Sequence, residues 1–178
     1  MTVMSDRIGW SFRSAVGASI PFLCALAGVI ASNIPVSVFG STVPPPMFGL
    51  MAIYFWCLVR PDLMPPFAVF IIGVLQDLLG GGPAGVWTLS FIAAYAIVDR
   101  ERDSFAGLAG IGAILGFAAG MLIAGASAYA IIAIYYWRMP PVAPIVVEIA
   151  VSVVFYIPVA LILGVIHRRL VGPLRGDF

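Results

Sequence analysis

The sequence predicts an all-α integral membrane protein with six transmembrane helices in one polytopic domain, residues 1–178. Of its 178 residues, 62% are hydrophobic and only 10% are charged, and the mean hydropathy is +1.12. Soluble domains carry roughly 25% charged residues. Charge-free apolar runs also recur along the chain, separated by short segments rich in charge, proline or glycine. A soluble fold would lack the side chains to cover its surface, so a bilayer is the predicted environment.

The first predicted span covers residues 14–34. A helix needs roughly 20 apolar residues to cross a hydrocarbon core of about 30 Å. This run has that length and ends at a segment rich in proline and serine. Arg7 and Arg13 precede it, a pattern that signal peptides share, with Ala31 near a candidate cleavage site. The later spans favour a retained anchor.

The second and third predicted spans cover residues 45–59 and 63–79. The Arg60-Pro61-Asp62 sequence forms the turn between them. The second run is short, but a helix that begins at its prolines would lengthen it, because proline is tolerated in a first helical turn. A re-entrant pair of half-helices is the alternative.

The remaining predicted spans cover residues 84–98, 104–137 and 142–166. The fourth follows a glycine turn and ends at the charged run 99–103, interpreted as a polar loop. The fifth run has no charge and is too long for an upright crossing, so one long tilted helix is expected, with Gly125 as its bend.

Arginines set the predicted topology, since cytoplasmic loops are enriched in basic residues. Six spans place eight of the nine on one face and only Arg138 on the other. We therefore expect a multi-pass protein of the bacterial cytoplasmic (inner) membrane with both termini in the cytoplasm. The eight are Arg7, Arg13, Arg60, Arg100, Arg102, Arg168, Arg169 and Arg175.

Enzymatic and cofactor-dependent functions find little support in the residues. The one histidine, His167, stands beside arginines at the end of the last span, and Cys24 and Cys57 lie singly in apolar runs. These residues do not form a metal-ligand cluster or a nucleophile with its base. The sequence has no phosphate-binding loop. A net charge of +1 without clustered basic residues also argues against nucleic acid. The sequence thus predicts no enzyme, cofactor or metal.

Three charged residues are expected near the external membrane face, where charges are costly unless paired or solvated. Asp77 stands just before the triple-glycine turn, where its carboxylate can cap the free amides at the start of the fourth span. A ligand or proton site is the alternative. Glu148 is expected to pair with Arg138 across a short loop.

Small residues at four-residue spacing mark one face of the fifth span. Gly112, Gly116 and Gly120 form this ridge, and Ala124 and Ala128 continue it. Such a ridge lets another helix approach closely. Packing within the protein is the favoured interpretation, with a homodimer seam or a partner's helix as alternatives.

The block from Pro45 to Asp99 resembles the rod shape-determining protein MreD family. The matching features are a short aromatic run at residues 52–56, the Arg60-Pro61-Asp62 turn, the sequence at residues 70–79, and a glycine turn with Pro83 and Gly85. A span with Tyr95 follows. Gly73 with Asp77 is the most specific element. Gln76 departs from the apolar residue usual in the family.

The resemblance implies a non-enzymatic scaffold of the bacterial cell elongation complex, which supports lateral peptidoglycan synthesis and rod shape. MreC is the implied direct partner. MreB, the glycosyltransferase and the penicillin-binding transpeptidase would connect through it, with membrane lipid around the spans. The family is also similar in fold to the substrate-binding (S) subunits of energy-coupling factor transporters.

That similarity gives the alternative function, a vitamin-like small-molecule binding subunit of an uptake transporter. Such a subunit needs polar ligand-binding residues on its outer side, where the sequence offers a small set: Asn33, Gln76, Asp77, Arg138 and Glu148. An intramembrane enzyme is the least supported class.

Overall fold

The fold is helical throughout the part of the chain that the structure describes. The computed structural model describes residues 3–34, 44–106 and 110–171, which contain six α-helices and no β-strand. The predicted all-α class is confirmed at this level. In chain order the elements are α1 (Val3–Asn33), α2 (Phe48–Val59), the 3-10 turn η1 (Pro61–Leu63), α3 (Pro66–Gly80), α4 (Val86–Ala106), α5 (Ile111–Tyr136), α6 (Ala143–Ile166) and the π-helical turn η2 (His167–Val171).

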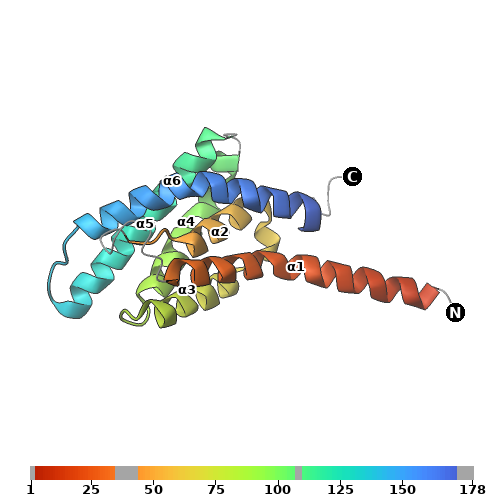
Figure 1. Cartoon of the computed structure of the whole chain (residues 1–178), viewed down its shortest axis with the longest axis horizontal. Coiled ribbons are helices and arrows are strands. Elements are labelled where there is room, and N and C mark those ends of the chain that lie inside the picture. The colour runs from red at the N-terminus through yellow and green to blue at the C-terminus, as the bar shows by residue number, and fades with distance from the viewer. Residues whose placement is uncertain (1–2, 35–43, 107–109, 172–178) are drawn as a thin grey trace.

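The short helix α2 lies in the middle of the bundle (Figure 1). Side chains on every side of it are buried, including Leu50, Tyr54 and Trp56, because α1, α4 and α6 pack closely around it. A helix that is apolar all round is typical of such a position. An aromatic cluster joins it to α5 and α6: Tyr54 contacts Phe117 of α5 and Tyr156 of α6, with ring centroids 5.5 and 5.6 Å away.

Within the described ranges, two helices are long and apolar enough to cross a membrane, namely α5 and the continuous segment formed by α6 and η2. The helices α2 and α3 have 12 and 15 residues. At about 1.5 Å per residue they extend roughly 18 and 22 Å, less than a hydrocarbon core of about 30 Å.

The predicted start of the second span is wrong. The helix α2 begins at Phe48, after a non-helical Met47 with φ −80° and ψ 68°, so the prolines do not form its first turn. A residue that precedes proline is pushed out of the helical region. Pro44 and Pro45 are each followed by proline, which keeps this segment non-helical.

The charged run 99–103 is helical, contrary to the predicted loop. The helix α4 continues through it to Ala106. No glycine or proline interrupts the sequence from Val86 to this point, and arginine and glutamate are good helix formers. The helix α1 likewise begins at Val3, well before the predicted residue 14.

The fifth span is also shorter than predicted. Residues 104–106 belong to α4, and α5 begins at Ile111 after Gly110, whose φ of 74° suits glycine alone among common residues. From there α5 is one continuous helix to Tyr136, and the bend at Gly125 stays a prediction. The helix α6 begins within one residue of its predicted start and ends at the predicted Ile166.

Candidate functional site

Asp77, near the end of α3, binds the beginning of α4. Its Oδ2 accepts hydrogen bonds from the amides of Gly85 (2.9 Å) and Thr88 (3.1 Å) and from the Thr88 hydroxyl (2.6 Å). Its Oδ1 accepts one from the Trp87 amide at 2.8 Å. The first amides of a helix have no partner inside that helix. The carboxylate supplies one from the neighbouring helix, as the sequence led us to expect, and it is buried there.

Gly73 brings the same two helices into contact one turn earlier on α3. A Cβ atom at this position would lie 2.6 Å from the Thr88 Cα, closer than real Cβ contacts occur. The absence of a side chain therefore lets the α4 backbone rest against α3. Since Gly73 and Asp77 are four residues apart, they lie on one face of the helix, and both act on Thr88.

Gln76 joins α3 to α1. Its Oε1 accepts a hydrogen bond of 3.3 Å from Nδ2 of Asn33, which also donates to the Val29 carbonyl at 2.8 Å. Gln76 is buried. This polar side chain is thus used to hold the end of α1.

Serine hydroxyls from two other helices accept hydrogen bonds from amides at the beginning of α2. The Phe48 amide donates to Ser32 Oγ of α1, and the Met47 amide donates to Ser152 Oγ of α6, each at 3.0 Å. Both serines are buried. Sequence reasoning missed them. In the sequence each is only a hydroxyl residue inside an apolar run. Such a residue does not indicate which helix start its hydroxyl will contact.

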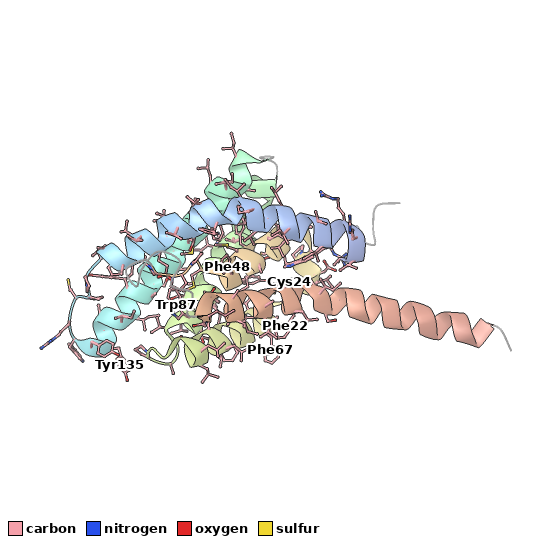
Figure 2. All side chains as sticks on the ribbon, in the orientation of Figure 1. Phe22, Cys24, Phe48, Phe67, Trp87 and Tyr135 are labelled. Carbon is pink, nitrogen blue, oxygen red and sulfur yellow. The ribbon has the colours of Figure 1, made fainter. Side chains whose placement is uncertain are left out.

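In Figure 2, Phe48 and Trp87 lie in the middle of the assembly, whereas Phe67 and Tyr135 lie at its edge. Phe48 begins α2, and Trp87 belongs to the first turn of α4. At the two helix starts that receive caps from other helices, Met47, Val86 and Thr88 are buried. An amide left without a partner in such a place would cost free energy comparable to a lost hydrogen bond.

The small-residue ridge of α5 faces the interior of the chain. Gly112, Gly116 and Gly120 are buried. Ala124 and Ala128 are buried as well. A Cβ atom at Gly120 would lie 3.4 Å from Cγ2 of Val98 on α4. This agrees with the favoured interpretation, packing within the protein.

The predicted pairing of Arg138 with Glu148 is not found. Among the described residues the ion pair is Arg60 with Asp62, 2.8 Å apart. Arg138 is exposed in the connection after α5, and Glu148 is half-buried. The physical reason is the position of Glu148 in the helix: α6 begins at Ala143, so Glu148 lies in its second turn, away from the connection that holds Arg138.

The Arg60 guanidinium lowers the pKa of the Asp62 carboxyl, mainly through their hydrogen bond. This pair lies at the turn η1, where the Asp62 side chain is 45% exposed and that of Arg60 only 11%. Two hydrogen bonds join them, from Nε and Nη2 of Arg60 to the two carboxylate oxygens of Asp62.

The arrangement offers structural contacts and little reactive chemistry. The carboxylate of Asp77, the amide of Gln76 and two serine hydroxyls are all engaged in holding helices together. Within the described residues, no group of three histidine, cysteine or acidic residues lies close enough to bind a metal. Cys24 and Cys57 are free of disulfides.

Over the residues that the structure describes, fold and site together define an all-helical protein, with two helices long and apolar enough to cross a membrane and helix starts capped from neighbouring helices. No protein-family profile, curated protein sequence or solved structure matches the chain at a significant level.

Proposed function

We propose that this chain is a non-enzymatic scaffold subunit of the bacterial cell elongation complex, similar to the MreD family. In this function it binds MreC directly and, through MreC, supports the peptidoglycan-synthesising enzymes and MreB. The proposal starts from the resemblance of residues 45–99. One observation carries it further: Gly73 and Asp77, the most specific residues of that resemblance, both hold Thr88 at the junction of α3 and α4.

The proposed topology has all six helices embedded in the cytoplasmic membrane, with both termini in the cytoplasm. The beginning of α1 and the end of α6 lie at the same side in Figure 1, which supports this arrangement. Arg60, Arg168 and Arg169 follow helix ends as cytoplasmic basic residues do. In this topology α2 and α3 do not cross the whole bilayer alone, and their neighbours bury their ends.

A scaffold needs a surface for its partner, and α6 offers one. Among its residues, Ser152, Tyr156 and Leu163 are buried, whereas apolar side chains such as Val154 and Val165 are exposed. Lipid covers such a face in a bilayer, and a single transmembrane helix of a partner can replace that lipid. We assign the MreC helix to this face.

The alternative of a vitamin-like binding subunit requires a roomy cavity with polar groups. The interior void beside Tyr54 has a volume of about 10 Å³, which is room for one water molecule. The Tyr54 hydroxyl is buried there without a hydrogen-bond partner among the described residues. This void suits a bound water better than a vitamin.

Copurification tests the proposed function. An affinity-tagged chain is coexpressed with MreC, extracted in mild detergent and passed over a gel-filtration column. We expect MreC to elute with the chain, and an MreC variant with an unrelated transmembrane helix to be lost. If a folded chain recovers neither form of MreC, the scaffold proposal is wrong. A small molecule bound to that chain would favour the uptake alternative.

A further inference from the structure

An apolar groove of about 280 Å³ opens between α2, α5 and α6. Its walls come from the end of α2, the beginning of α5 and the second half of α6. Representative lining residues are Phe55, Leu58, Ala113, Ile114, Ile157 and Ala160. This groove is separate from the Asp77 junction, which lies between α3 and α4.

The groove exists because α5 and α6 are in close contact at one level and leave space at another. A Cβ atom at Gly125 would lie 2.9 Å from Cδ1 of Ile149, so the helices touch there. Toward the beginning of α5, the lining residues Gly110, Ala113 and Ala160 are too small to fill the space between the helices. The inner wall is firm, because Tyr156 stacks on Phe117 with ring centroids 4.4 Å apart.

Positive charge lies beside this groove. Ala160, Gly164 and Arg168 follow one another at four-residue spacing along one side of the last helical segment. Nη1 of Arg168 lies 4.0 Å from where a Cβ atom at Gly164 would be, so the guanidinium folds back by about one turn toward Ala160. Arg168 and Arg169 are exposed, and no carboxylate in the described ranges forms an ion pair with either.

We propose that the groove binds an acyl chain of an anionic phospholipid, whose phosphate is held by Arg168. The inference rests on the membrane location proposed above. Apolar walls give water no hydrogen-bond partners, so hydrocarbon fills the groove in a bilayer. Arg168, which has no ion-pair partner in the described ranges, complements a phosphate group in charge and geometry. Basic sites between helices on the cytoplasmic side are known to recognise lipid headgroups in this way.

The size of the groove favours a lipid chain over the helix of a partner. A helix with its side chains is about 10 Å across, and at that width a volume of about 280 Å³ holds less than one helical turn. An acyl chain is a much thinner object. The MreC helix is therefore proposed to pack on another face of α6, outside this groove.

Native mass spectrometry of the full chain in detergent tests the proposal. The protein is titrated with phosphatidylglycerol and, separately, with phosphatidylcholine of the same acyl chains. We expect one phosphatidylglycerol molecule per chain to be retained in preference to phosphatidylcholine. Arg168→Gln should reduce that preference roughly fivefold, since one arginine near a lipid headgroup contributes about that much to anionic lipid binding.

Variants that fill the groove provide a second test of lipid binding. Ala113→Phe should weaken lipid retention roughly tenfold, because its ring occupies the space of several methylene groups. Ala126→Phe is the matched control, since Ala126 lies on the same helix and is exposed. Ala160→Leu fills the groove from the opposite wall and replaces Ala113→Phe if that variant does not fold.

The outcomes separate the possible occupants. Unchanged lipid retention in both groove variants, or an unchanged phosphatidylglycerol preference in Arg168→Gln, would overturn the proposal. Loss of MreC from Ala113→Phe with lipid retention intact would assign the groove to a partner helix and also overturn it. A wild-type chain that retains phosphatidylglycerol but recovers no MreC would contradict the proposed function alone.

Discussion

The Thr88 hydroxyl lies 2.6 Å from Oδ2 of Asp77, and the amide of the same threonine donates to the same oxygen from 3.1 Å. Thr88 is also the residue whose Cα lies against Gly73. One residue of α4 therefore receives both the hydrogen bonds and the close packing of α3. At this junction, the glycine at position 73 allows close approach, and the carboxylate of Asp77 one turn later provides the hydrogen bonds.

Close packing at this junction makes Gly73→Ala destabilising. The added methyl group would lie 2.6 Å from backbone of α4, which cannot rotate away as a side chain can. Overpacking of this kind costs about 1–3 kcal/mol. We expect a lower melting temperature in detergent. Gly82→Ala is the matched control, because a methyl group there meets nothing within 4 Å. Equal melting temperatures of the two variants would contradict the close contact.

The sequence predicted the helices well and their ends poorly. Apolar runs located the middle of every helix, because burial and bilayer both select for such runs. The ends depend on local backbone preferences that hydropathy does not measure. Because of successive prolines, α2 begins later in the chain than predicted. The helix-forming residues of the run 99–103 extend α4 into a segment that was interpreted as a loop.

The site was predictable only where its partners are close in sequence. Asp77 precedes the amides that it caps by 8 to 11 residues, across a glycine turn that forces the chain back. Ser152 instead accepts a hydrogen bond from an amide 105 residues away. Predicting that contact requires knowledge of how all the helices pack. The Arg138 and Glu148 prediction was wrong because proximity in sequence was taken for proximity in space.

The small-residue ridge leads to a prediction for Gly116→Leu. Gly116 is buried on the side of α5 that faces the rest of the bundle. A leucine side chain there separates the helices, and packing losses in membranes can amount to about a kcal/mol or more. We expect a lower melting temperature and less recovered MreC. Ala126→Leu, on the exposed face of the same helix, should change neither. If Gly116→Leu behaves like this control, the ridge is not packed.

The proposed topology can be tested by cysteine labelling. In a background in which Cys24 and Cys57 are replaced, Glu101→Cys should not react with an impermeant thiol reagent outside intact spheroplasts. Arg138→Cys should react, since it belongs to the opposite side in the six-span arrangement. Both positions are exposed in the protein, so accessibility does not limit either reaction. Labelling at position 101 from outside would exclude cytoplasmic termini with six spans.

The last prediction separates a structural role of Asp77 from a role in proton or cation transfer. Asp77→Asn keeps the shape and one acceptor oxygen, whereas Asp77→Leu keeps bulk and removes every acceptor. Four hydrogen bonds depend on this carboxylate, three of them from backbone amides near the start of α4. Replacing a helix cap by an apolar residue costs about 0.5–2 kcal/mol in water, and unsatisfied amides cost more beside hydrocarbon. We therefore expect a mild loss of folding yield and MreC recovery for Asn and a severe loss for Leu.

Matched changes at Glu101 control for the loss of a carboxylate as such, because this side chain is exposed. Glu101→Gln and Glu101→Leu should both leave the folding yield nearly unchanged. A transfer site would give a different order at Asp77, since it requires an ionisable group: Asn would fail as completely as Leu in restoring rod shape to MreD-depleted cells, while both proteins accumulated normally. The capping geometry requires the opposite, with Asn close to wild type in cell shape and Leu lost at the folding step, because the hydrogen bonds of the carboxylate go to backbone amides and to Thr88.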